Sequence, residues 1–362
     1  MPYTLSETAS ITPHPLAIRN PRRMALVLLG LMLLAVFIGS LAFGSVAIPL
    51  EQVVAILTGR EPAQASWGYI VLTLRLPRAC TAVLAGAALA VSGLQMQTLF
   101  RNPLAEPFIL GISAGASLGV ALLTLATGTV GMLAGIGLVG HLGLTSAAIA
   151  GAAGVMSLVL VLGRRIRSNT TLLILGLMFG YVAAAIVSVL IHFGAPEHVQ
   201  LYLNWTFGNF GAVGWPQLGM LATVISGGLL GSFLLAKPLN ALLLGEVYAR
   251  SLGLNVALTR FWIIVSASLL AGTTTAYCGP IAFLGIAVPH LCRSLFRTTE
   301  HRLLVPATLL LGGLLALLAD CVARLPGSDL SLPLNAVTAL IGAPTVMWIL
   351  LRHGSQRELA DR

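Results

Sequence analysis

The feature that most constrains this chain is the length of sequence that carries no formal charge. Residues 107–163, between Glu106 and Arg164, contain no Asp, Glu, Lys or Arg. A membrane-spanning helix needs about 20 consecutive apolar residues, so this stretch holds two spans joined by a glycine-rich turn near 131–143. The chain of 362 residues is 57% hydrophobic and 9% charged. This composition predicts an all-α, polytopic membrane protein.

Clusters of basic residues divide the rest of the chain into further apolar blocks. The block 168–236 predicts two spans separated by a polar segment. The block 261–292 is too long for one span and is broken at Gly279-Pro280, so it predicts two more, the second short and kinked by Pro289. Four single spans complete a predicted total of ten: about 24–44, 70–98, 303–323 and 333–351.

Charge placement sets the expected orientation of these ten spans. With both termini in the cytoplasm, all but four of the twenty Lys and Arg residues lie on the cytoplasmic side, as topology rules require. The net charge of +9 reflects this asymmetry and does not indicate nucleic-acid binding. We therefore expect a cytoplasmic tail over 1–23, a transmembrane domain over 24–352 and a second cytoplasmic tail over 353–362.

No catalytic motif is present in the sequence. A phosphate-binding P-loop needs Gly-Lys followed by Ser or Thr, whereas the single lysine, Lys237, lies between Ala236 and Pro238. The chain is therefore not an ATPase, and any ATP that drives it is used by a separate subunit. We expect no covalently bound cofactor and no metal site, since the four cysteines form no CxxC pair.

The polar segment 237–260 is the largest surface expected to face the cytoplasm. The sequence predicts a helix here on which small residues recur every fourth position, so that a partner could approach the backbone closely. An acid and a base four residues apart lie at the rim of this strip. The small residues and the rim pair are Gly245, Ala249, Gly253, Glu246 and Arg250.

Three arginines at span ends lie on the outer side, against the usual charge rule. Arg75 and Arg78 begin the second span, and Arg324 ends the ninth, four residues after Asp320. An ion pair between Asp320 and Arg324 is expected from this spacing. Two interpretations of the arginines stay open: local ion pairs or headgroup anchors, and docking of an acidic partner. Transport driven by an ion gradient is a further alternative, although Asp320 is the one strong candidate for an acid deep in the membrane.

Several longer motifs point to a known family. The chain resembles the permease subunits of type II ABC importers, the FecCD family, which takes up ferric siderophores, haem and cobalamin. The match extends from about residue 24 to 352. Its motifs are LRLPR (74–78), GAALAVSG through QTLFRNPLAEP to LGISAGAS (86–117), GPIAFLGIAVPHLCR (279–293) with HR (301–302), LADCVAR (318–324) and LIGAPTVMWIL (340–350).

The resemblance implies a homodimer in the bacterial inner membrane, with two ABC ATPase subunits below it and a periplasmic binding protein above it. It implies that Arg75, Arg78 and Arg324 receive carboxylates of the binding protein and that 237–260 is the element coupled to the ATPase. Asn169 and Thr170 fall where cytoplasmic gate residues occur in the family. The implied substrate is a metal chelate, with a ferric siderophore favoured and haem or cobalamin as alternatives.

Overall fold

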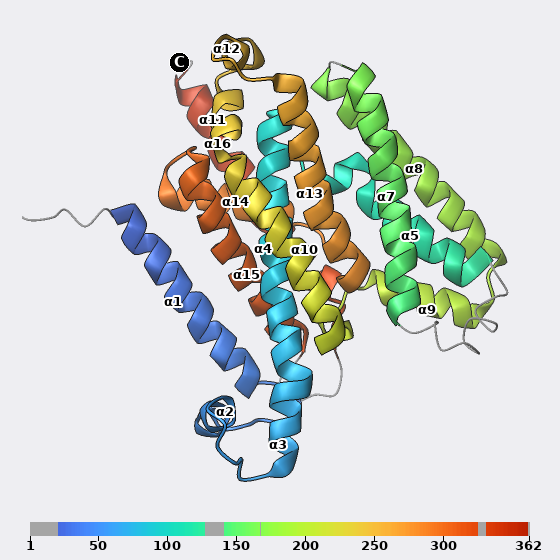
Figure 1. Ribbon diagram of the computed structural model, residues 1–362, viewed down its shortest axis with the longest axis vertical. Helices are drawn as coiled ribbons and strands as arrows, with labels where there is room; N and C mark the ends of the chain where they lie inside the picture. Colours follow the sequence, from blue (N-terminus) through green and yellow to red (C-terminus); the bar gives the residue numbers. More distant parts are fainter. Residues whose placement is uncertain (1–20, 127–140, 167, 325–330, 361–362) are drawn as a thin grey trace, which may run out of the picture.

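The computed structural model describes residues 21–126, 141–166, 168–324 and 331–360, and every regular element in these ranges is a helix (Figure 1). Seven of the described helices or helical runs are long and apolar enough to cross a membrane: Pro21–Ala42, Ala65–Phe100, Gly143–Gly163, Thr170–Phe193, Trp215–Leu234, Val256–Cys278 and His301–Ala323. Three shorter apolar helices are Ile112–Leu125, Leu284–Phe296 and Leu334–Met347. The predicted all-α membrane fold is confirmed, while ten crossings and the side of the termini stay predictions.

The helices follow one another in the order predicted from the apolar blocks. The first half contains α1 (Pro21–Ala42), α2 (Leu50–Leu57), α3 (Ala65–Tyr69), the π-helix η1 (Ile70–Arg75), α4 (Leu76–Phe100), η2 (Pro107–Leu110), α5 (Ile112–Ala121), η3 (Leu122–Ala126), α7 (His141–Arg165) and α8 (Asn169–Phe193). The second half contains α9 (Pro196–Thr206), η4 (Phe210–Ala212), α10 (Trp215–Leu234), α11 (Ala236–Leu243), α12 (Glu246–Ser251), α13 (Val256–Cys278), α14 (Leu284–Phe296), α15 (His301–Ala323) and α16 (Leu334–Ala360).

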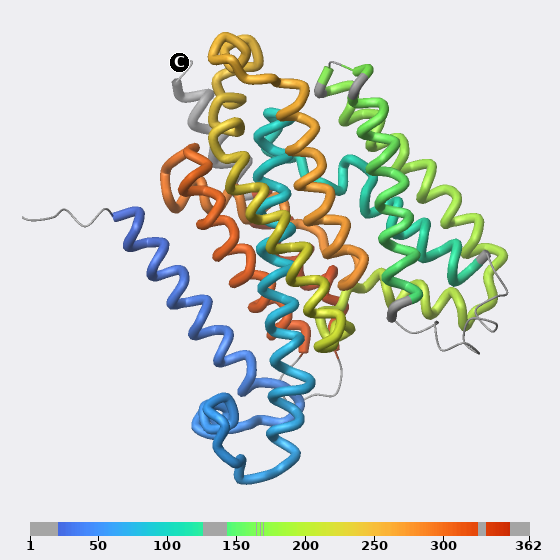
Figure 2. Tube along the Cα trace, in the orientation of Figure 1, coloured from blue at the N-terminus to red at the C-terminus, as the bar shows by residue number. Residues whose placement is uncertain are grey.

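Helix α4 is the centre of the bundle, with α10, α13, α14 and α15 packed around it (Figures 1 and 2). Its small residues let neighbouring backbones approach closely. A Cβ atom on Gly86 would lie 2.2 Å from the carbonyl oxygen of Gly312 in α15, and one on Gly93 would lie 1.9 Å from that of Gly285 in α14. Helices α4, α14 and α15 therefore touch backbone to backbone.

A second group of helices, α5, α7, α8 and α9, lies to one side of this centre (Figure 1). A Cβ atom on Gly115 of α5 would lie 2.6 Å from the carbonyl oxygen of Gly151 in α7, and one on Gly119 would lie 2.1 Å from that of Ala147. Helices α5 and α7 therefore also touch backbone to backbone.

The predicted break in the block 261–292 is present. Helix α13 ends at Cys278 and α14 begins at Leu284, with Pro289 inside its 13 residues. Helices α11 and α12 lie at one end of the molecule, near the end of α16, whereas α2 and α3 lie at the opposite end (Figure 1). Long helices such as α4 connect the two ends, and each end carries residues singled out from the sequence.

Candidate functional site

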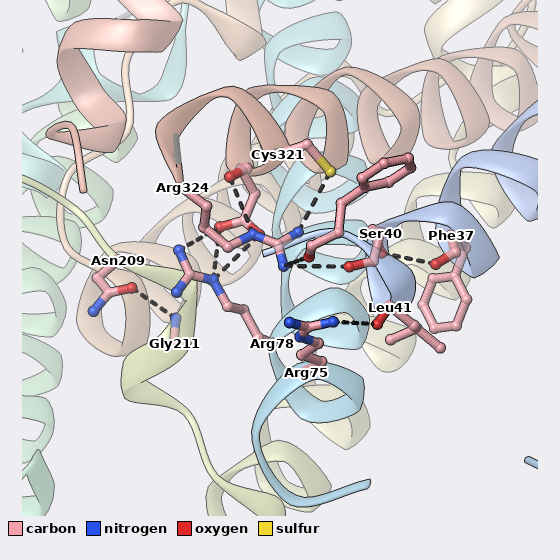
Figure 3. A network of polar contacts seen from close by, with 11 residues as sticks. Phe37, Ser40, Leu41, Arg75, Arg78, Asn209, Gly211, Cys321 and Arg324 are labelled. Carbon is pink, nitrogen blue, oxygen red and sulfur yellow. Dashed lines mark hydrogen bonds and ion pairs between the residues drawn. The ribbon is translucent and has the colours of Figure 1, made fainter. Parts of the chain in front are cut away.

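A buried carboxylate joins two of the predicted docking arginines (Figure 3), near the end of α15 that lies away from α12 (Figure 1). Asp320 near the end of α15 is 1% exposed. Its oxygens lie 2.8 Å from Arg78 Nη2 and 3.1 Å from Arg324 Nε. The predicted Asp320–Arg324 pair is therefore present, but Arg78, 242 residues away in sequence, shares the same carboxylate. No local pattern in the sequence predicts that contact.

Arg75 has a different environment, although it lies only three residues before Arg78. Its guanidinium group is buried and donates to the carbonyl oxygens of Leu41 at 2.7 Å, of Ala42 at 3.0 Å and of Val46. The carbonyls of Leu41 and Ala42 lie in the last turn of α1, where a helix lacks intrahelical donors, and that of Val46 lies in the connection that follows. Arg75 therefore holds the end of α1, and this placement does not leave its charge open to an acidic partner.

Arg324 contacts both Asp320 and backbone carbonyls at the end of α1. Besides Asp320, it donates to the carbonyl oxygens of Ser40 and Phe43, both at 3.2 Å. Arg78 and Asp320 also line a cavity of about 380 Å³, which includes Asn209. Arg78, with 24% of its side chain exposed, is the arginine of this group that a carboxylate from outside reaches most readily.

The segment 237–260 differs from its predicted form. It is not one helix: α11 ends at Leu243, α12 begins at Glu246, and the chain turns between them at Gly245, whose φ is +117°. Gly253 lies beyond the end of α12 with φ of +82°, and Ala249 is fully buried. The prediction of one helix with an exposed strip of small residues is therefore wrong. Both glycines are needed for backbone conformations that other residues rarely adopt.

The exposed face of this segment is instead apolar, a feature that the sequence reasoning missed. Leu244, Val247 and Leu252 are 65%, 79% and 61% exposed, and Tyr248 is half exposed. We refer to these four residues as the α12 patch. They lie outside the apolar helices that could span a membrane. Exposed apolar residues gathered in one short polar segment indicate a surface that a partner covers. Their common exposure could be recognised only once the break at Gly245 was known.

The predicted pair on α12 is present as part of a larger cluster. Glu246 lies 3.4 Å from Arg250 and 2.8 Å from Arg260 of α13. Arg260 also donates to the carbonyl oxygen of Ile166, in the connection between α7 and α8, at 3.5 Å. The shorter and more buried contact, with Arg260, fixes α12 to α13, whereas Arg250 is largely exposed.

The predicted gate residues lie at the start of α8. Asn169 is its first residue, and its side chain lies outside the described residues. Thr170 is exposed, and Ser168 caps the helix by accepting from the Thr171 N–H at 3.2 Å. Within the described ranges, no three His, Cys, Asp or Glu side chains form a cluster that could hold a metal ion.

These features define a class: a polytopic, all-helical membrane protein with a charged cluster at one end and an exposed apolar patch at the other. The profile of the FecCD transport family matches residues 31–352. The vitamin B12 import system permease proteins BtuC of Shigella sonnei strain Ss046 and of Escherichia coli O6:H1 are each 38% identical over 281 residues, which cover 78% of this chain and 83% of theirs.

A solved structure described as an inward-facing conformation of a metal-chelate type ABC transporter superposes with a TM-score of 0.79. It is 28% identical, and the match covers 91% of this chain and 99% of that one. The chain belongs to the FecCD transport family. It is an ABC importer permease of the bacterial inner membrane, a transport subunit and not an ATPase, as the resemblance implied.

Proposed function

We propose that this chain is the translocation subunit through which a metal chelate passes from the periplasm to the cytoplasm, driven by ATP hydrolysis on separate ATPase subunits. The observation that carries the proposal is the α12 patch, an exposed apolar surface at the end that charge placement predicts to be cytoplasmic. The sequence has no P-loop, so this patch is where an ATPase would dock, with Glu246 and Arg250 at its rim.

At the opposite end, we propose that Arg78 and Arg324 receive an acidic binding protein. An incoming carboxylate would compete with Asp320, which already lies within 3.1 Å of both arginines. The charges of this group do not cancel, because two arginines share one carboxylate. The remaining positive charge favours approach of an acidic surface. Docking by Arg75 itself would require it to release the carbonyls of α1.

A homodimer is part of the proposal, as is a gate near Asn169 and Thr170. Helix α8 carries the proposed gate residues at its start, and its apolar residues remain exposed in a single chain: only 17% of its most apolar window is buried. An exposed apolar face in a spanning helix is covered by lipid or by another helix. The substrate class comes from the relatives, whose names give vitamin B12 and a metal chelate. We rank a corrinoid beside the ferric siderophore that the sequence favoured, with haem as the third candidate.

The test is uptake into proteoliposomes that contain this chain together with the ATPase and the binding protein of its host. Labelled cyanocobalamin, a ferric hydroxamate and haem are compared, each with ATP or with a non-hydrolysable analogue. ATP-dependent uptake of one chelate supports the proposal and identifies the substrate. Uptake that persists without the ATPase and collapses with an uncoupler would overturn it in favour of an ion-driven transporter.

Docking at the outer end has its own test. Arg78→Glu should weaken binding of the binding protein to the detergent-solubilised permease by at least about tenfold, because a like charge now faces the incoming carboxylate. Arg60→Glu, in the connection between α2 and α3, is the matched control for a change of net charge. Equal binding by the wild type and Arg78→Glu would exclude this docking position.

A further inference from the structure

Histidine 301 is a buried polar residue that joins three helices. It is the first residue of α15, and 1% of its surface is exposed. Its Nδ1 lies 2.7 Å from Asn240 Oδ1 of α11, and its Nε2 lies 2.8 Å from Thr98 Oγ1 of α4. The backbone N–H of His301 also donates to Asn240 Oδ1, at 2.9 Å. The imidazole of His301 thus connects α11, which precedes the α12 patch, to α4 and α15.

The direction of these hydrogen bonds follows from their partners. The backbone N–H of His301 can only donate, so the Asn240 atom that faces it is the amide oxygen. That oxygen requires a hydrogen on Nδ1, so in a neutral imidazole the other nitrogen, Nε2, carries none. The single hydrogen of the Thr98 hydroxyl is then shared between Nε2 at 2.8 Å and the carbonyl oxygen of Leu94 at 2.9 Å. Asn240 acts only as an acceptor here. An aspartate at the same position would keep both hydrogen bonds, whereas alanine would lose them.

A second connection holds the same helix α11 at its end. Arg101, which follows α4 in a left-handed conformation with φ of +49°, donates to the carbonyl oxygen of Leu242 at 2.9 Å. The last carbonyls of a helix lack intrahelical donors, so a cation at this position is favourable. Helix α11 is therefore attached to α4 twice, through Thr98 by way of His301 and through Arg101.

The two helices that hold α11 also hold the charged cluster at the other end of the molecule. Helix α4 carries Thr98 near its end and Arg78 near its start, while α15 carries His301 at its start and Asp320 near its end. Between these points the two backbones touch at Gly86 and Gly312, where a Cβ atom has no room. Closely packed helices move together instead of deforming, so α4 and α15 form one rigid pair.

We propose that the α4–α15 pair is the lever that connects the two ends of the permease, and that the Asn240–His301–Thr98 clamp is where movement of α11 and α12 enters it. Asn240 and His301 are positioning residues, since neither contacts a substrate. This inference rests on the proposed function. It adds a route by which ATPase docking on the α12 patch reaches the Arg78–Asp320–Arg324 cluster.

The experiment compares Asn240→Ala with the wild type in the complete reconstituted complex, with cyanocobalamin, a ferric hydroxamate and haem as the probes. The amount of ATPase that copurifies and its rate of ATP hydrolysis should stay near wild type. ATP hydrolysed per molecule imported should rise by about five- to tenfold, as expected for loss of one or two hydrogen bonds in the active conformation. Asn240→Asp, which keeps the acceptor oxygen, should restore the ratio to within about twofold of wild type.

The matched control is Asn102→Ala. Asn102 Oδ1 also accepts one backbone N–H, that of Leu104 at 2.9 Å, at the same end of the molecule but within a single turn. The Asn102→Ala variant should hydrolyse as much ATP per molecule imported as the wild type. The proposal that α4 and α15 act as a lever would be overturned if Asn240→Ala hydrolysed as much ATP per molecule imported as the wild type. It would also be overturned if Asn102→Ala raised this ratio as much as Asn240→Ala does. Absence of ATP-dependent uptake by the wild type would instead overturn the proposed function, so the two failures are distinguishable.

Discussion

The buried Asp320 gives the sharpest test of how this fold is held together. Asp320→Ala removes the carboxylate that lies 2.8 Å from Arg78 and 3.1 Å from Arg324, and leaves both cations without that partner. Removing one member of a buried ion pair destabilises a protein by about 3–5 kcal/mol. The side chain of Arg78 is 24% exposed and that of Arg324 is 12% exposed, so water compensates in part. We expect the lower value, about 3 kcal/mol.

The same chain provides the control. Glu246 and Arg250 have the same four-residue spacing, but they lie 3.4 Å apart and the Arg250 side chain is 64% exposed. Breaking such a pair costs about 0–1 kcal/mol, which is the effect expected of Arg250→Ala. Asp320→Asn keeps one acceptor oxygen and should fall between the two.

The assay is thermal unfolding of the purified permease in detergent, followed by the monodisperse fraction on size-exclusion chromatography. At about 2–4 °C per kcal/mol, Asp320→Ala should lower the midpoint by at least about 6 °C and Arg250→Ala by less than about 4 °C. If Asp320→Ala melted within about 2 °C of the wild type, which is less than the shift of one kcal/mol, the carboxylate would not hold α4 to α15.

Three further outcomes follow from the geometry. Gly86→Leu should greatly reduce the yield of folded protein in an expression assay, because even its Cβ atom would lie 2.2 Å from the Gly312 carbonyl oxygen. Gly154→Ala is the control and should be neutral, because a Cβ atom there meets nothing within 4 Å. Gly245→Val should abolish uptake without preventing insertion, since φ of +117° is strained for valine by about 1–3 kcal/mol; unchanged uptake would exclude this conformational role. Burial raises the pKa of Glu106, in the connection after α4, from 4.5 to about 7. Ionising it is therefore unfavourable in the folded state, so stability should fall as pH rises from about 4.5 to 7 and then level off. Glu106→Gln should lose this dependence in melting curves at pH 5 and pH 8, and an unchanged slope would contradict the assignment.

The Asp320–Arg324 pair shows how far local sequence patterns reach. Its four-residue spacing on a helix places the two side chains on one face, so the pair could be predicted and is present. Arg78 joins the same carboxylate from 242 residues away. His301 meets Asn240 across 61 residues and Thr98 across 203. Nothing local distinguishes these partners, because the contacts exist only after α4, α11 and α15 have packed.

The segment 237–260 shows that one spacing of small residues is compatible with two backbone conformations. The spacing of Gly245, Ala249 and Gly253 fits one face of a helix, but the chain turns at both glycines, which permit positive φ. The same residue type serves close packing in a helix and a left-handed turn between helices. Only the backbone conformation distinguishes the two uses, and here it exposes the α12 patch in place of a strip of small residues.

The sequence by itself determined that this chain is an all-helical membrane permease without an ATPase site, and it determined the order of the apolar helices. Those properties depend on the length of apolar runs, on the positions of charges and on the absence of a short motif, all of which are local. The tertiary structure alone decided which arginine is buried against α1, which residues share Asp320 and which helices hold α11. Those contacts depend on how the helices pack, because packing brings together polar groups that lie far apart in the sequence.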